Sequence, residues 1–177
     1  MSSAKWRPQK RLVDIVKVFK TYKNLYEGDT YLIIIGEEKE NDDDNHIIYL
    51  PFVENKEMSK YLRSADIYLF LSWLDACPNS VLEAIACNIP VICTNQGGTK
   101  EILNITSGGI IVNADEVYNY KAVNLQEPPK PNYEKIIDAI TLMVKDLDFY
   151  KKQIDTTKID INYVASRYYA FLKSCNE

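Results

Sequence analysis

The sequence predicts an α/β domain in which a doubly wound, mainly parallel, Rossmann-like sheet carries helices on both faces. Short, continuous apolar runs recur between residues 31 and 113, and stretches with helical periodicity separate them. Apolar runs without polar alternation are typical of strands covered on both faces, as in a parallel sheet. Strands and helices that alternate at this pace indicate a doubly wound layer.

The chain opens on the polar stretch MSSAKW, where a domain of this kind usually begins with an apolar strand. Either a short strand forms there, or the chain begins inside a larger protein. The strands that follow are expected at residues 31–36, 47–50, 67–72, 90–94 and 109–113. The helices between them are expected at residues 12–26, 55–64, 80–87 and 99–103.

The pattern changes after Val112. Residues 114–132 contain three prolines and are typical of a surface excursion. Residues 133–145 and 161–174 have helical periodicity, and we expect both helices to pack on the sheet. The last helix carries an aromatic cluster that we interpret as packing, not as a binding platform: Tyr163, Tyr168, Tyr169 and Phe171. No repeat or linker interrupts the chain, so we expect one domain over residues 1–177.

The composition is that of an ordinary soluble protein, with 177 residues, 46% apolar and 26% charged. A chain of this length suits one compact domain. No apolar run reaches the roughly 18 residues that a membrane helix needs, and the first residues lack a signal-peptide core. We expect a cytoplasmic protein without a transmembrane segment.

The cysteines and the histidine do not predict a metal site. The four cysteines show no CxxC spacing, and His46 is the only histidine, so a zinc set is implausible. We expect reduced and mostly buried thiols. His46 opens an apolar run and is interpreted as a strand-edge residue, not as a base.

The net charge of −4 conceals an asymmetry. Residues 1–24 hold seven Lys or Arg against Asp14 alone, whereas residues 37–44 hold six acids against Lys39. Because no basic surface extends over the whole domain, nucleic acid is not an expected partner. A local anion site near the N-terminus remains open. The acidic run is interpreted as a solvated loop, with calcium a weaker alternative because EF-hand spacing is missing.

Three polar segments are expected at the edge where ligands bind in open α/β sheets, beyond the carboxyl ends of the strands. They are residues 5–10, 75–80 and 95–98. The second segment begins a helix, whose N–H groups at Asn79, Ser80 and Val81 and partial positive charge suit an anion. The carboxylates of Asp75 and Glu83 flank this turn.

Each of these features also has a purely structural explanation. Ser80 and Glu83 fit a capping box, in which Glu83 binds the backbone N–H of Ser80. The pair Gly97-Gly98 marks turns in many proteins. Arg7 and Lys10 are equally typical of solvated surface charges.

Read together, residues 62–103 (LRSADIYLFLSWLDACPNSVLEAIACNIPVICTNQGGTKEIL) closely resemble the donor-binding segment of family 4 glycosyltransferases with the GT-B fold. That pattern is an acid, seven residues, Glu-Ala, a small or Cys/Ala stretch, Pro-Val and Gly-Gly-x-x-Glu. The matching positions here are Asp75, Glu83-Ala84, Ala86-Cys87, Pro90-Val91 and Gly97-Gly98-Thr-Lys-Glu101. Upstream, KWRPQKRLVDIVKVF resembles the family's opening loop and helix, with Lys10 at its lysine. The similarity spans residues 5–112.

The resemblance implies a role for each of these residues. Glu83 accepts hydrogen bonds from the ribose of a nucleotide, and Asp75 faces the hydroxyls of the donated sugar. Lys10 and the helix N-terminus take the diphosphate, the latter through Pro78, Asn79, Ser80 and Val81. The resemblance also assigns Phe52 and Val53 to the base and places Gly97 and Gly98 at the donor site. Fixed cations and a helix dipole neutralise a diphosphate without a metal. The implied donor is a UDP- or GDP-sugar, with no prosthetic group.

Two residues depart from the family pattern. The first acid is usually Glu, and Asp75 is one methylene shorter. The family's arginine usually precedes the lysine by five or six residues, where this chain has Lys5 and Ala4. Arg7 is the candidate that replaces it at the diphosphate.

The resemblance covers only the C-terminal of the family's two Rossmann-like domains. It therefore implies the donor-binding half of a retaining glycosyltransferase, with an N-terminal acceptor domain on a longer protein or on a separate chain. The acceptor (glycan, lipid or small molecule) is open, as is peripheral membrane attachment through the missing domain. Half a cleft is expected to bind a nucleotide sugar and transfer it poorly. The alternatives are a nucleotide-sugar-binding or regulatory module without catalysis, and an α/β signalling domain without a nucleotide.

Overall fold

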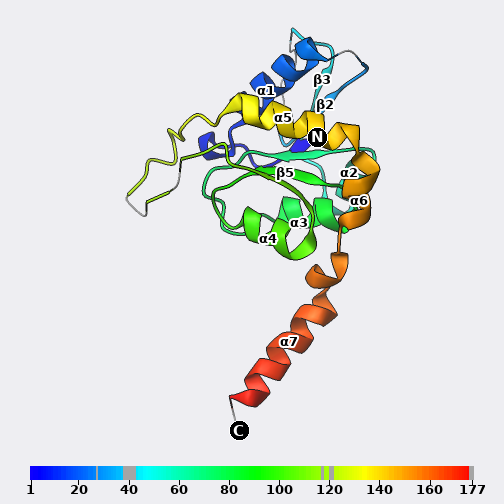
Figure 1. Cartoon of the computed structure of the whole chain (residues 1–177), viewed down its shortest axis with the longest axis vertical. Helices are drawn as coiled ribbons and strands as arrows, with labels where there is room; N and C mark the ends of the chain where they lie inside the picture. The colour runs from blue at the N-terminus through cyan, green and yellow to red at the C-terminus, as the bar shows by residue number, and fades with distance from the viewer. Residues whose placement is uncertain (27, 38–42, 117, 120–121, 176–177) are drawn as a thin grey trace.

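A computed structural model describes the chain except for residues 27, 38–42, 117, 120–121 and 176–177 (Figure 1). The described strands are all parallel and form two three-stranded sheets, ordered β1-β2-β3 and β4-β5-β6. Their bounds are β1 (Ser2–Ser3), β2 (Leu32–Ile35), β3 (Ile47–Leu50), β4 (Tyr68–Phe70), β5 (Val91–Thr94) and β6 (Gly109–Val112).

The two sheets meet edge to edge at β1 and β4. The amino group of Met1 donates to the carbonyl of Ile67 at 2.9 Å, and the N–H of Leu69 donates to the carbonyl of Met1 at 2.9 Å. The six strands thus follow the order β3-β2-β1-β4-β5-β6, which is the order of a doubly wound Rossmann fold. The short strand that was one possibility for MSSAKW is therefore present as β1.

The polarity of β1 is explained by a buried partner. The hydroxyl of Tyr68 in β4 lies 2.8 Å from the Oγ atom of Ser3 and donates to the Ser3 carbonyl at 2.9 Å. Both side chains are buried, and a buried hydroxyl is tolerated when it is hydrogen-bonded. A serine can therefore occupy a strand position that the apolar pattern alone does not identify.

Two hydrophobic cores cover the two faces of the sheet. The first is closed by α1 (Leu12–Leu25) and α5 (Tyr133–Lys145), and the second by α2 (Asn55–Arg63), α3 (Asn79–Ala86) and α4 (Thr99–Thr106) (Figure 1). Successive residues of β5 alternate between them, with Ile92 in the first core and Val91 and Cys93 in the second. A strand whose two faces are both buried has no polar alternation, which is why the apolar runs predicted this architecture.

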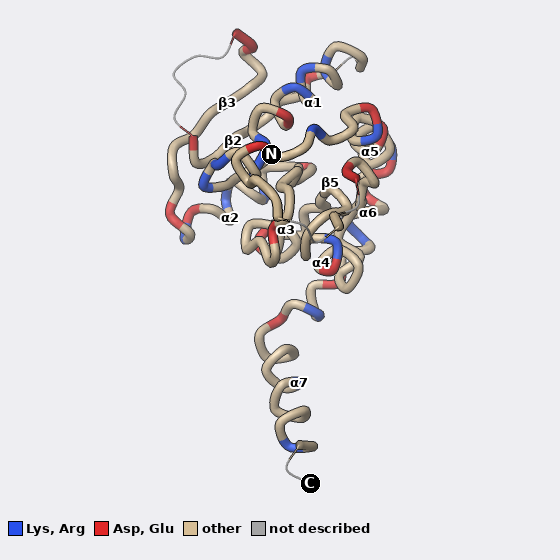
Figure 2. Tube along the Cα trace, turned by 90° about the vertical axis from the view of Figure 1, so that its left-hand side faces the viewer, with Lys and Arg blue, Asp and Glu red and all other residues tan. Residues whose placement is uncertain are grey.

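The C-terminal region differs from expectation. The helix predicted at residues 161–174 forms as α7 (Ile161–Ser174), but none of its residues is buried, and it extends away from the sheet in both views (Figures 1 and 2). The packing role assigned to its aromatic residues is therefore wrong for this chain, since Tyr168, Tyr169 and Phe171 are 68%, 72% and 65% exposed. An amphipathic pattern predicts an apolar face but not what covers it.

Smaller differences concern the ends of elements. The helix expected at residues 99–103 continues to Thr106, whose hydroxyl donates to the Ile102 carbonyl at 2.7 Å, and ends at Ser107 in a left-handed conformation. A short helix α6 (Leu147–Gln153) and a 3-10 turn η2 (Thr156–Ile159) were not predicted.

The cysteines are unpaired, and their burial is mixed. Cys93 is buried, and burial raises the pKa of its thiol to about 12. Cys77 and Cys175 are exposed, so the expectation of mostly buried thiols is wrong for those two. His46 lies at the edge of β3, as predicted, with Nδ1 at 3.0 Å from the Thr30 carbonyl oxygen. Residues 38–42 of the acidic run lie outside the described residues.

Within the part of the chain that the structure describes, no helix combines the length and the hydrophobicity needed to cross a membrane.

Candidate functional site

A hollow of about 470 Å³ opens at the carboxyl edge of the sheet. One wall is the opening loop, which contains the 3-10 turn η1 (Pro8–Lys10). The other wall is the loop that leads from β4 to α3, residues 72–80. Of the predicted site residues, the lining includes Arg7, Lys10, Asp75, Pro78, Asn79 and Ser80. Two of the three polar segments predicted at this edge thus form one cavity.

Backbone contacts hold the two walls together. The N–H of Trp73 donates to the Gln9 carbonyl at 2.8 Å, and the hydroxyl of Ser72 reaches the same oxygen at 3.4 Å. Leu74, which also lines the hollow, has a left-handed backbone with φ of 57°. A leucine rarely adopts this conformation, and it persists only where the surroundings enforce it.

Lys10 and Asp75 form an ion pair inside the hollow. Their side chains are 22% and 17% exposed, and the Lys10 ammonium also lies 5.4 Å from the centroid of the Phe70 ring. Arg7 and Lys5 lie at the same hollow and are exposed. The cations that the sequence assigned to an anion are therefore gathered at one place, with a carboxylate among them.

The N-terminus of α3 faces this hollow. Pro78 is its N-cap, and the helix receives no hydrogen bond from a capping side chain. The N–H of Val81 donates to the Pro78 carbonyl at 3.1 Å, so this group, which we expected to be exposed, is already engaged. The N–H groups of Asn79 and Ser80 have no hydrogen-bond partner among the described residues. Two free N–H groups and the positive end of the helix dipole remain for an anion.

Glu83 is not a capping residue. Because α3 begins at Asn79, Ser80 lies inside the first turn and cannot be the N-cap of a capping box. Glu83 is half-buried, and burial raises the pKa of its carboxyl above the ordinary 4.5. This carboxyl forms no hydrogen bond or ion pair with a residue that the structure describes. Glu83 does not line the hollow itself, and its charge acts on the nearby Tyr68 hydroxyl.

Gly97 and Gly98 lie behind the wall that carries Asp75. A Cβ atom on Gly97 would lie 2.4 Å from the Asp75 carbonyl oxygen, and one on Gly98 would lie 1.8 Å from that of Ala76. The N–H of Gly98 donates to the Asp75 carbonyl at 2.8 Å. These glycines allow two loops to touch, which gives the turn-forming pair a specific role in placing Asp75.

The two residues assigned to the base lie away from the hollow. Phe52 is 81% exposed, and Val53 is partly buried against the second core. Neither lines the cavity. Of the residues that the structure describes, no group of three or more His, Cys, Asp or Glu is placed to hold a metal ion.

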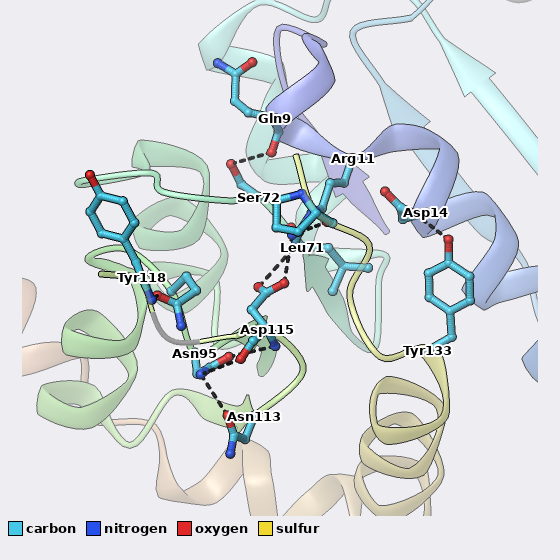
Figure 3. A network of polar contacts seen from close by, with 12 residues as sticks. Gln9, Arg11, Asp14, Leu71, Ser72, Asn95, Asn113, Asp115, Tyr118 and Tyr133 are labelled. Atoms are coloured by element: carbon cyan, nitrogen blue, oxygen red, sulfur yellow. Dashed lines mark hydrogen bonds and ion pairs between the residues drawn. The ribbon is translucent and has the colours of Figure 1, made fainter. Parts of the chain in front are cut away.

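The sequence does not reveal a buried ion pair beside the site. Arg11 and Asp115 form a bidentate salt bridge in which both side chains are 0% exposed (Figure 3). From the sequence, Arg11 is simply one of the basic residues of the N-terminal stretch. No local pattern identifies the pair, because 104 residues separate the partners and both types are usually exposed.

Known proteins with similar sequences include a probable sucrose-phosphate synthase and a glycosyltransferase. A protein of Thermosipho melanesiensis described as "Probable sucrose-phosphate synthase" is 27% identical over an alignment of 149 residues that covers 76% of this chain and 34% of that protein. A D-inositol 3-phosphate glycosyltransferase of Paenarthrobacter aurescens is 33% identical over 66 residues, which are 37% of this chain and 16% of that protein. The chain thus spans about a third or less of these relatives.

Solved structures with the same fold have low identity. Sucrose-phosphate synthase of Thermosynechococcus elongatus superimposes with a TM-score of 0.68 at 13% identity, covering 98% of this chain and 44% of that one. HepE of Anabaena, solved in complex with UDP-glucose, has a TM-score of 0.60 at 12% identity, covering 94% and 48%. The fold is that of a GT-B glycosyltransferase domain. The family described as "Glycosyl transferases group 1" matches residues 1–159, and the chain therefore belongs to that family.

Proposed function

We propose that this chain is the C-terminal, donor-binding domain of a retaining family 4 glycosyltransferase and that it binds a nucleotide diphosphate sugar. One observation carries the proposal: Lys10, Asp75 and the free N–H groups of Asn79 and Ser80 meet in one hollow at the carboxyl edge of the sheet. This combination of fixed cation, helix dipole and carboxylate suits a ligand with a diphosphate and a polyhydroxylated end.

The diphosphate binds at the positive side of the hollow. Asn79 and Ser80 donate their N–H groups, and Lys10 exchanges its ion pair with Asp75 for the phosphate oxygens. Arg7 reaches the same anion from the rim. When the glycosidic bond breaks, negative charge grows on the leaving diphosphate, and these fixed groups stabilise it without having to reorganise.

The two ends of the ligand bind the two carboxylates. Asp75, released from Lys10, accepts hydrogen bonds from the hydroxyls of the donated sugar. Glu83 accepts from the ribose, and a carboxylate with no other hydrogen-bond partner is suited to that role. We place the base toward the side of Phe52 and Val53, which follow β3. UDP is the first nucleotide to test, because the relative from Anabaena is in complex with UDP-glucose.

Thermal unfolding with a panel of UDP- and GDP-sugars tests this function. A ligand at about 100 times its dissociation constant adds about 2.7 kcal/mol of stability, which gives a measurable shift in Tm. We expect one nucleotide class to raise Tm in the presence of a metal chelator. Lys10→Met is the informative variant, since it should lose this shift while keeping the Tm of the free protein. A panel without any shift would contradict the proposal.

A further inference from the structure

The guanidinium of Arg11 is buried behind the hollow and joins three segments. It donates to Asp115 from Nη1 at 3.0 Å and from Nη2 at 2.8 Å. It also donates to the carbonyl oxygens of Leu71, at 3.2 Å, and Pro129, at 2.6 Å. Figure 3 shows Arg11 between the end of β4 and the segment that follows β6. A buried ion pair is costly unless such additional hydrogen bonds compensate the loss of water.

Arg11 also determines the backbone conformation of the chain next to Lys10. Its φ of 57° and ψ of 42° are left-handed, which a non-glycine residue adopts rarely. In this conformation its N–H donates to the Pro8 carbonyl at 3.0 Å and its carbonyl accepts from Ile15 at 3.0 Å. The turn η1 therefore ends, and α1 begins, at this one residue. The buried side chain supplies the constraint that holds such a conformation in place.

The same side chain holds the proline-containing excursion against the site. Asp115 lies where the excursion leaves β6, and Pro129 lies where it returns towards α5. Leu125, between them, lines the hollow. Asn95 supports Asp115 from the other side, because its Oδ1 atom accepts from the Asp115 N–H at 3.1 Å. One guanidinium thus connects the loop of Lys10, the end of β4 and the wall that carries Leu125.

We propose that Arg11, through its buried pair with Asp115, is a positioning residue of the donor site. It holds Lys10 at the diphosphate and seats residues 122–129 as the outer wall of the hollow. The identity of the ligand rests on the proposed function above. Arg11 is fully buried and does not touch the ligand, so its effect on binding passes through Lys10 and Leu125.

Two variants separate positioning from stability. Arg11→Gly preserves the left-handed backbone but leaves the Asp115 carboxylate buried without its partner, and we expect a lower Tm and weaker nucleotide binding. Arg11→Gly combined with Asp115→Ala removes the unpaired charge, so we expect much of the loss in Tm to be recovered. Arg63→Ala, which removes an exposed arginine of α2, is the matched control and should change neither quantity.

Nucleotide affinity in the double variant decides the proposal. Calorimetry with UDP and with GDP, at a temperature where all variants are folded, should give roughly 10- to 100-fold weaker binding than wild type, the range for one charged hydrogen bond. Wild-type affinity in the double variant would overturn the proposal, because Arg11 would then serve stability alone.

Hydrogen exchange tests the same inference without a nucleotide. The N–H of Lys10 donates to the Arg7 carbonyl at 2.8 Å, and that of Glu127 donates to the Asn124 carbonyl at 3.1 Å. In the double variant both amides should lose protection, while Ile92 in the buried strand β5 keeps it. Unchanged protection at Lys10 and Glu127 would overturn the positioning role, whatever the nucleotide result. If wild type bound neither UDP nor GDP, the proposed function would fail, and the exchange data would still decide the role of Arg11.

Discussion

Lys10 and Asp75 satisfy each other in the hollow, so a ligand has to separate them. Both side chains are partly exposed, and an ion pair at the surface is worth only about 0–1 kcal/mol. A diphosphate carries more charge than one carboxylate and offers Lys10 a stronger partner. The pair therefore poses little barrier to binding, and it leaves Asp75 free to face the sugar once the diphosphate has bound.

Asp75→Asn separates the two roles of this carboxylate. The variant removes the competitor for Lys10, so affinity for free UDP or GDP should stay the same or rise. Affinity for the corresponding nucleotide sugar should fall by roughly 1–3 kcal/mol, because a charged acceptor for the sugar hydroxyls is lost. Calorimetry with each ligand measures the split. Equal losses for the nucleotide and the nucleotide sugar would place Asp75 in the scaffold and not at the sugar.

Glu83→Gln tests the ribose contact. We expect nucleotide binding to weaken by roughly 1–3 kcal/mol, the range for losing a charged hydrogen-bond acceptor. The Tm of the free protein should change little, because Glu83 does not cap α3 and its carboxyl has no hydrogen-bond partner among the residues described. The reverse pattern, a lower Tm with unchanged affinity, would assign Glu83 a structural role.

The raised pKa of Glu83 also predicts a pH dependence. The folded chain binds the proton of the Glu83 carboxyl more tightly than the unfolded chain does. The free energy of unfolding should therefore rise as the pH is lowered through this raised pKa, which lies above 4.5. The same protonation removes the charge that accepts from the ribose, so nucleotide affinity should fall over that range. Comparing wild type with Glu83→Gln by calorimetry at several pH values isolates this effect from ionisation of the nucleotide. A wild-type profile parallel to that of the variant would count against the assignment.

Among the elements, those that the sequence predicted well are the ones that local pattern determines. The strands β2, β4 and β5 are apolar runs with residues in both cores, and the turn before α3 follows from Pro78 and Asn79. The features that the sequence did not predict depend on residues that are distant in the chain. Ser3 becomes a strand residue because Tyr68 binds it, and Arg11 is buried because Asp115 neutralises it. Periodicity carries no information about such pairs.

The contact between the loop after β5 and the loop after β4 can be broken by one methyl group. Gly98→Ala would place its Cβ atom 1.8 Å from the Ala76 carbonyl oxygen, so the wall that carries Asp75 must shift. We expect a loss of about 1–3 kcal/mol in the free energy of unfolding, as for other overpacked sites, together with weaker donor binding. Denaturant titration measures the first effect and calorimetry the second.

A glycine in open surroundings provides the control. A Cβ atom added at Gly28 would have no other atom within 4 Å, so Gly28→Ala reports backbone strain without a clash. It should leave donor affinity unchanged. Wild-type affinity in Gly98→Ala would show that the close approach of the two loops does not position Asp75.

For the molecule as a whole, α7 contributes little to stability. None of its residues is buried, whereas Ile154 and Ile159, just before it, pack against the second core. A chain shortened to residues 1–160 should keep its free energy of unfolding within about 0.5 kcal/mol, as expected when only exposed groups are removed. Shortening to residues 1–153 also removes both isoleucines and should cost considerably more. A large loss in the first variant would mean that α7 packs on the domain in solution.

Sugar transfer is expected to need a second domain. The chain covers 34% of the sucrose-phosphate synthase relative and 44% of the solved one, and we propose that it supplies only the donor side of the cleft. Retaining transfer needs donor and acceptor held in one geometry, a contribution of several kcal/mol that one wall does not supply. We expect this chain to bind its nucleotide sugar and to transfer it negligibly to any acceptor in a panel.

Activity should increase when an N-terminal Rossmann-like domain is added, on the same chain or in trans. The Lys10→Met variant of the combined protein controls for the donor site and should stay inactive. Robust turnover by the 177-residue chain alone would refute the need for a second domain. Binding without transfer in the combined protein would instead favour a nucleotide-sugar-binding module without catalysis.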